Sequence, residues 1–209
     1  RYKLFGVDKY RYMPDPVASI LQYNGKDIRI QLGISESKLI FLHPGSMDSY
    51  KNTLGILRAL MLLNKEDADK LAIVLAGRVV PGMRGEFDFL YNKVRERVEI
   101  IFIEGYISFE KLADLFVTCD YVLVPYTVKG QSSGVIGHAA FYGKPVISVR
   151  GGVIGKMVRK WHLGYLLSDP SPDTICQHLK ALINQPTYST EGNDYIETHS
   201  IEQFCDVIS

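Results

Sequence analysis

The sequence predicts an α/β fold, a single doubly wound parallel sheet of about six strands with helices on both faces. Short apolar runs of strand length alternate with longer segments of helical period, which is typical of a parallel sheet covered by helices. Most of the short runs are apolar throughout, as strands are when both faces of their sheet are buried. No internal repeat or low-complexity tract interrupts this alternation.

Six segments are expected to be strands, the last with a weaker pattern than the others: Leu39–His43, Leu71–Ala76, Val98–Ile103, Tyr121–Val124, Pro145–Val149 and Gly164–Leu167. Five are expected to be helices: Lys51–Asn64, Phe109–Val117, Gly134–Tyr142, Asp173–Asn184 and Tyr195–Val207. The first helix has its leucines at i, i+3 and i+4 positions, and Asp48 or Ser49 is expected to cap it. Ser108 is the expected N-cap of the second helix.

These elements divide the chain into three parts. Residues 1–33 are expected to be a lead-in segment between domains, residues 34–185 the sheet domain, and residues 186–209 a linker and a C-terminal helix. Hydrophobic residues make up 46% of the chain, charged residues 22%, and the net charge is +1, so we expect one core. A charge so close to zero argues against nucleic acid as a partner, since non-specific binding needs a strongly basic surface.

The cysteines indicate the cellular compartment of the protein, and the first residues indicate whether the sequence is a fragment. Cys119, Cys176 and Cys205 are far apart and odd in number, which favours a reducing, cytoplasmic compartment over a disulfide framework. No run approaches the roughly 18 apolar residues of a membrane span, so we expect no transmembrane segment, while peripheral contact of the full-length protein with a membrane stays open. The chain begins without methionine, in the polar and aromatic run Tyr10–Pro16, and we interpret it as a fragment.

The loop after the first strand is the first candidate for a site, because ligands of open parallel sheets sit outside the carboxyl ends of the strands. It contains Gly45 and Ser46, and Lys51 follows at the start of a helix. An ammonium group there adds to the positive end of the helix, which is unfavourable unless an anion lies nearby. The alternative is a solvated surface lysine.

A second candidate is the loop Lys129–Val135, which leads into the small apolar helix. Ser132, Ser133 and Gly134 supply hydroxyl donors and unpaired N–H groups at a helix N-terminus, which suits a phosphate. The alternative is an ordinary capped turn, since serine and glycine are common in turns.

Two further loops carry weaker signals. Tyr106 and Ile107, in Glu104–Ser108, could flank a base, the alternative being a tyrosine that anchors the loop to the core. The glycine-rich turn Arg150–Lys156 has the wrong spacing for the dinucleotide fingerprint Gly-x-Gly-x-x-Gly, and no acidic residue ends a strand about 20 positions later. We therefore expect no nicotinamide cofactor, and no Asp-x-Asp pair indicates a metal site.

In order and spacing, these motifs resemble the C-terminal, donor-binding domain of GT-B fold retaining glycosyltransferases of family four. The resemblance covers about Ile34 to Leu182. It rests on Phe41–Gly45 with Tyr50 and Lys51, Leu71–Gly77, Gly105–Ser108, Cys119–Tyr126, Ser133–Val135, Gly143–Ile147 and Gly151 with Gly152.

The resemblance implies the donor-binding domain of a hexosyltransferase in polysaccharide or glycoconjugate synthesis, which takes a nucleotide-diphosphate sugar without a metal or other cofactor. Lys51 then binds the diphosphate and is the catalytic residue. Around the same diphosphate the expected residues are Gly45, Ser46, Ser132, Ser133 and Gly134, and near the ribose and base Tyr106, Ile107 and His138. The acceptor domain is expected before residue 1, so that this chain alone binds the nucleotide and transfers little or no sugar.

Three positions depart from the family's pattern. The arginine that usually follows the glycine is Ser46 here, and the two glutamates of the Glu-x7-Glu motif fall on Gly130 and His138. The first glutamate near the sugar is thus lost, and His138 is expected to replace the second at the ribose, the alternative being a satisfied core histidine. A subgroup with Pro-Tyr and Gln-Ser-Gly in this region is more similar, so we interpret the departures as subfamily variation.

The sequence also gives expectations for the other histidines and leaves two alternative protein classes to consider. His43 is expected to point at the same cleft, and His162, His178 and His199 to lie at surface or helix positions. A related sugar-nucleotide epimerase would need catalytic acids and a histidine that the sequence does not place. A non-catalytic flavodoxin-like or receiver-like module stays as the other alternative, although a receiver needs an acidic cluster where the first strand ends in His43-Pro44-Gly45.

Overall fold

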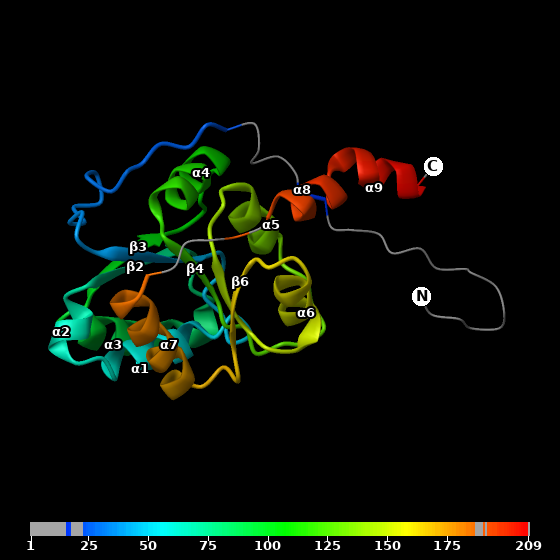
Figure 1. Cartoon of the computed structure of the whole chain (residues 1–209). Helices are drawn as coiled ribbons and strands as arrows, with labels where there is room; N and C mark the ends of the chain where they lie inside the picture. Colours follow the sequence, from blue (N-terminus) through cyan, green and yellow to red (C-terminus); the bar gives the residue numbers. More distant parts are fainter. Residues whose placement is uncertain (1–15, 18–22, 187–189, 191, 209) are drawn as a thin grey trace.

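All six expected strands are present, and they form a single parallel sheet in the order β3-β2-β1-β4-β5-β6 (Figure 1). The computed structural model describes residues 16–17, 23–186, 190 and 192–208. The strands are β1 (Leu39–Pro44), β2 (Leu71–Gly77), β3 (Glu99–Glu104), β4 (Tyr121–Val124), β5 (Val146–Val149) and β6 (Gly164–Leu167). The chain moves outward from β1 to β3 and then returns to place β4 on the other side of β1. This reversal opens a crevice between the carboxyl ends of β1 and β4, where doubly wound folds bind ligands.

Helices follow most of the strands. They are α1 (Thr53–Met61), α2 (Lys65–Ala68), α3 (Arg84–Val94), α4 (Phe109–Thr118), α5 (Gly134–Phe141), α6 (Gly152–Lys160), α7 (Pro172–Asn184), α8 (Asn193–Thr198) and α9 (Ile201–Ile208), with a 3-10 turn η2 at Pro81–Met83. Ser108 caps α4 as expected, since its side chain accepts a hydrogen bond from the N–H of Lys111.

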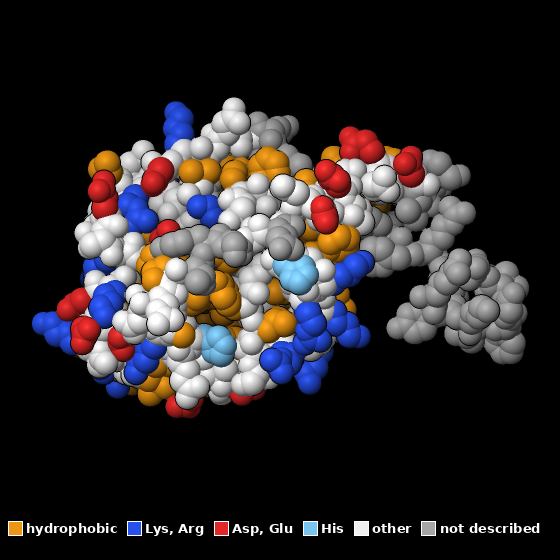
Figure 2. All heavy atoms as spheres, in the orientation of Figure 1, with side chains coloured by type: hydrophobic (Ala, Val, Ile, Leu, Met, Phe, Trp, Pro, Cys, Tyr) orange, Lys and Arg blue, Asp and Glu red, His pale blue; other side chains and the backbone are white. Residues whose placement is uncertain are grey.

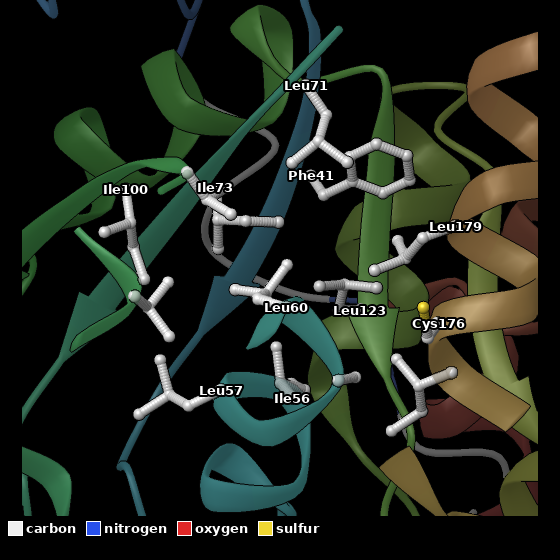
Figure 3. Packing of buried hydrophobic residues seen from close by; sticks show 14 of the residues in the cluster. Phe41, Ile56, Leu57, Leu60, Leu71, Ile73, Ile100, Leu123, Cys176 and Leu179 are labelled. Carbon is white, nitrogen blue, oxygen red and sulfur yellow. The ribbon is translucent and has the colours of Figure 1, made fainter. Parts of the chain in front are cut away.

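Side chains alternate between two cores, one on each face of the sheet. Phe41, Ile73 and Leu123 point to the face covered by α1, α3 and α7, where they pack against Leu60 and Leu179 (Figure 3). Neighbouring strand residues, such as those at 40, 42, 72 and 74, point to the opposite face and pack against α4, α5 and α6. Most positions of the central strands are apolar because they face one of the two cores.

The first and last expected helices differ from the structure. The expected helix Lys51–Asn64 begins at Thr53 and ends at Met61, and neither Asp48 nor Ser49 is its N-cap. Asn52 holds that position in the left-handed conformation, with φ 63° and no side-chain cap bond. The expected helix Tyr195–Val207 is two helices, α8 and α9, because the chain turns at His199 and Ser200.

The sequence did not predict three of the helices, which are the short α2 and the longer α3 and α6. The helix α3 is strongly charged, and only Phe87 and Val94 are buried in it. The helix α6 lies where a glycine-rich turn was expected, because Gly151, at φ 101°, turns the chain and the helix begins at Gly152. The Gly152 backbone passes so close to Lys129 that a Cβ would lie 2.6 Å from the Lys129 carbonyl oxygen.

Charge on the visible face is uneven. Basic side chains gather over α6, where Lys156, Arg159 and Lys160 are exposed, whereas acidic side chains gather toward α8 and α9 (Figure 2). Cys119 and Cys176 are buried free thiols, and Cys205 is exposed. Among the described residues, no helix is long and apolar enough to cross a membrane.

Candidate functional site

A cavity of about 840 Å³ opens at the carboxyl edge of the sheet. Its walls come from the loops after β1, β2 and β3 and from the start of α5, so it lies at the crevice that the strand order creates. The lining includes all of the residues expected at a site: Gly45, Ser46, Lys51, Tyr106, Ile107, Ser132, Ser133, Gly134 and His138. The fold therefore brings these residues together, and their roles in binding stay predictions.

Lys51 lies in the floor of this cavity rather than in solvent. Its side chain is only 7% exposed, and its Nζ lies 3.4 Å from the carbonyl oxygen of Pro44. The same Nζ lies 5.9 Å from the ring centroid of Tyr50 and 5.6 Å from that of Tyr126, close enough for cation–π attraction. Burial lowers the pKa of Lys51, and the Asp48 carboxylate opposes that shift. The alternative of a solvated surface lysine is wrong.

The loop that carries Lys51 is held by Asp48. Its carboxylate accepts hydrogen bonds from the Lys51 N–H, at 3.0 Å, and from the Ser46 hydroxyl, at 2.7 Å. Asp48 does not line the cavity, so its role is to close the turn. Ser46 reaches the cavity with its hydroxyl already donated to Asp48.

Two glycines let the loops after β1 and β2 touch. Gly45 has φ 103°, and a Cβ there would lie 2.1 Å from the Lys51 ammonium nitrogen. Gly77 has φ 150°, and a Cβ there would lie 1.8 Å from the carbonyl oxygen of Gly45. Only glycine fits this conformation and this approach without backbone movement, so both glycines shape the cavity floor.

The start of α5 lines the same cavity as the ammonium group. Ser133 is the N-cap residue, and its side chain makes no cap hydrogen bond, so the hydroxyl is not used to cap the turn. The first N–H groups of a helix have no partner within it, and here those of Gly134 and Val135 lie at the cavity lining. A buried ammonium and a positive helix end thus converge on one space.

Tyr106, Ile107 and His138 form another part of the cavity wall. Tyr106 is 87% exposed, so the alternative of a tyrosine anchored in the core is wrong. His138 is half-buried beside Phe116, and its Nδ1 has no hydrogen-bond partner among the described residues. Burial lowers the pKa of His138 to about 4, which keeps the ring neutral at pH 7. It is not a satisfied core histidine.

His43 is a correction to the sequence interpretation. It lies on β1 but is fully buried, and it does not line the cavity. Its Nδ1 lies 2.9 Å from the Leu123 carbonyl oxygen and its Nε2 3.0 Å from the Thr53 hydroxyl. Both ring nitrogens are occupied, so His43 ties β1 to β4 and α1 below the site. Among the other histidines, His199 is also fully buried, at the C-cap of α8.

Two residues of this region were missed by sequence reasoning. Arg78 follows Gly77 and lines the cavity, but no motif marks it. Tyr126 is 6% exposed, and its hydroxyl is buried without a hydrogen-bond partner among the described residues. Burial raises the pKa of Tyr126, and Ser133 lowers it by less. A tyrosine directly after a strand-ending proline was the only available signal.

Comparison with protein families adds an independent finding. The sequence profile described as "Glycosyl transferases group 1" matches residues 24–198. The chain belongs to the group 1 glycosyl transferases. This assignment favours neither of the alternatives, the epimerase and the non-catalytic binding module. A search of curated protein sequences gives no significant match.

Solved structures of glycosyltransferases share the fold. HepE from Anabaena, in complex with UDP and glucose, superposes with a TM-score of 0.68 and 18% identity over 89% of this chain and 54% of its own. WaaG, a glycosyltransferase involved in lipopolysaccharide biosynthesis, superposes with a TM-score of 0.75 and 20% identity over 94% of this chain and 55% of its own. The C-terminal domain of a group 1 glycosyl transferase, LpcC from Francisella tularensis, superposes with a TM-score of 0.68 and 18% identity. This match covers 86% of this chain and 96% of that domain. The chain thus spans about half the length of HepE and WaaG.

Metal ligands do not gather in the described part of the chain. No group of three or more histidine, cysteine, aspartate or glutamate side chains there could hold an ion. The charged side chains that line the cavity are Lys51 and Arg78, both cationic. The site is therefore suited to an anion.

Proposed function

We propose that this group 1 glycosyl transferase chain is the donor-binding half of a retaining enzyme that takes a nucleotide-diphosphate sugar. The observation that carries the proposal is the convergence of Lys51 and the N-terminus of α5 on one cavity at the switch point of the sheet. Lys51 is a buried ammonium, and no carboxylate lines the cavity with it, so an anion bound in the cavity would stabilise its charge. The N–H groups at the start of a helix bind phosphate readily.

The same groups suit the chemistry of sugar transfer. When the anomeric C–O bond breaks, negative charge builds on the departing diphosphate, and donors already fixed at that place stabilise the transition state. Lys51 and the N–H groups of Ser133 and Gly134 are these donors in our proposal. Because they carry the positive charge, the mechanism needs no metal ion or other cofactor.

With the diphosphate at Lys51 and the start of α5, the other lining residues are left for the base and the ribose. Tyr106 offers an exposed ring and Ile107 a partly exposed apolar side chain for a base. The neutral, half-buried His138 lines the same cavity, and we place the ribose beside it. HepE binds UDP, so UDP is the first nucleotide to test, with GDP and ADP beside it. The products we expect are polysaccharides or glycoconjugates made in the cytoplasm.

The acceptor is proposed to bind to a second domain. This chain spans about half the length of HepE and WaaG, and its cavity is assigned here to the donor. We therefore expect the 209-residue chain to bind the donor nucleotide and to transfer little or no sugar. Peripheral contact of the whole enzyme with a membrane would be compatible with this arrangement.

Lys51 is the residue to change first. Isothermal titration of the chain with UDP, GDP and ADP should give saturable binding to at least one of them. Lys51→Met keeps most of the side-chain volume and removes the charge, so affinity for that nucleotide should fall by about tenfold or more, the usual cost of a lost charged hydrogen bond. In the complete enzyme we expect kcat to fall by about 10²–10³.

Lys65→Ala is the matched control. Lys65 is exposed and precedes β2, at the opposite edge of the sheet from the cavity. Its removal should leave nucleotide affinity within twofold of the original chain. No binding of any nucleoside diphosphate by the unaltered chain, or equal affinity in Lys51→Met, would overturn the proposal.

A further inference from the structure

Arg78 brings a second cation to the cavity from the loop after β2. Its backbone carbonyl accepts a hydrogen bond from the N–H of Met47 at 2.7 Å, which fixes it beside the loop after β1. The residue is exposed, and no ion pair of its guanidinium is found among the described residues. Arg78 thus lines the cavity, and its guanidinium is not neutralised by a carboxylate of the described residues.

The pairing of the two loops sets where Arg78 stands. Pro44 pairs with Ala76 inside the sheet, and Met47 pairs with Val79 beyond the turn with the same offset. Ser46 and Arg78 are therefore corresponding positions of the two loops. Ser46 is neutral and donates its hydroxyl to Asp48, so Arg78 supplies the charge at this point of the cavity wall.

Lys51 supplies one cation, whereas a nucleoside diphosphate has two phosphate groups. The Asp48 carboxylate on the same loop already attracts this ammonium, and no carboxylate lines the cavity that would neutralise a second cation. An arginine guanidinium binds phosphate through two parallel N–H bonds, in a geometry that a lysine cannot give. Two phosphates and two separate cations are therefore matched in number.

The order of the strands predicts which phosphate each cation contacts. Along the carboxyl edge, the loops follow the order β3, β2, β1, β4, which places Tyr106 first, Arg78 next, and then Lys51 and the start of α5. If the base lies at Tyr106, Arg78 meets the phosphate nearest the nucleoside and Lys51 the distal one. The distal phosphate is the one that bears the sugar, which agrees with a catalytic role for Lys51.

We propose that Arg78 binds the nucleoside-proximal phosphate of the donor, while Lys51 and the N-terminus of α5 hold the distal phosphate. This assignment rests on the proposed function and adds to it a division of labour between the two cations. Arg78 is then a binding residue for every nucleotide with at least one phosphate, and Lys51 one for diphosphates alone.

A comparison of nucleoside mono- and diphosphates tests this assignment of the two phosphates. Affinities for UMP and UDP are measured by titration in EDTA, so that a divalent ion cannot supply charge, and the pairs GMP and GDP, and AMP and ADP, are run in parallel. Arg78→Gln should weaken the binding of the mono- and diphosphate alike, each by about tenfold, and leave their ratio unchanged. Lys51→Met should weaken the diphosphate by about tenfold and leave the monophosphate within twofold.

Arg95→Gln is the matched control, because Arg95 is exposed at the end of α3 and does not line the cavity. It should change neither affinity, and Arg78→Lys should recover part of what Arg78→Gln loses. The urea midpoint of each variant shows that it is folded. The assignment is overturned if Arg78→Gln binds both ligands as the original chain does, or if it weakens the diphosphate alone. Absence of all nucleotide binding by the original chain contradicts the proposed function itself, which separates the two failures.

Discussion

Burial sets the charge of the histidine beneath the cavity. His43 is fully buried between β4 and α1, and its pKa is lowered to about 4, chiefly by burial. The hydrogen bond to the Leu123 carbonyl opposes this shift, and the Lys51 ammonium adds to it. A neutral ring under Lys51 avoids placing two cations together, so the floor of the site carries a single ammonium at pH 7.

This burial predicts an acid-sensitive fold. Between the unfolded pKa of 6.5 and the folded pKa of about 4, the unfolded chain binds more protons, so the free energy of unfolding falls as pH falls through that range. His43 should account for a loss of about 2 kcal/mol between pH 7 and pH 5. Urea unfolding at pH 7 and pH 5 checks this. Between these pH values the free energy of unfolding of His43→Gln should fall by about 2 kcal/mol less than that of the original chain. An unchanged drop would show that His43 does not titrate in this way.

At the scale of the elements, the contact between the loops after β1 and β2 decides whether the cavity exists. The Gly77 backbone lies against Gly45, and this approach holds Arg78 and the Lys51 loop in register. The glycines here are therefore a condition for the site, in addition to the strands and helices that surround it.

Gly77→Ala should accordingly lower both stability and nucleotide affinity. The new Cβ must move the Gly45 backbone, and we expect the free energy of unfolding to fall by about 2–4 kcal/mol. Gly85→Ala is the control, since a Cβ at Gly85 would meet no atom within 4 Å. Because Gly85 lies in α3, the alanine should raise the free energy of unfolding, by up to about 1 kcal/mol. Urea unfolding of both variants checks this, and equal effects would show that the contact has no special role.

The sequence predicted elements well wherever burial dominates. The central strands were found because both of their faces are buried, so that apolar residues run without a break, as in Leu71–Gly77. The edge strands β3 and β6 are only partly buried, and β6 had the weakest pattern. The helix α3 was missed because it lies at the surface with charged residues on most sides, and α6 because glycines that start a helix look like a turn. Helix ends at Thr53 and Met61 depend on loop contacts that no local pattern carries.

The candidate site was predictable in part, for the same reason. Gly45, Lys51 and the Ser133–Gly134 helix start follow strands that end at one edge, so their convergence follows from the strand order. Arg78 needed the pairing of two loops, which only the coordinates give. The burial of His43, with both ring nitrogens bonded, also needed the positions of β4 and α1.

For the whole molecule, the layout separates stability from binding. The two cores lie on the faces of the sheet, and Figure 3 shows one of them. The cavity lies at the carboxyl edge, where changes to polar side chains leave the cores intact. Variants at Lys51 and Arg78 should therefore fold normally, so that losses of affinity report on the site.

The most direct measurement is a crystal structure of the chain soaked with UDP, or with GDP or ADP if titration favours one of them. Our account predicts a diphosphate in the cavity, with phosphate oxygens within about 3 Å of both the Lys51 ammonium and the N–H of Gly134. A nucleotide bound elsewhere on the molecule, or one in the cavity whose phosphates contact neither group, would contradict it.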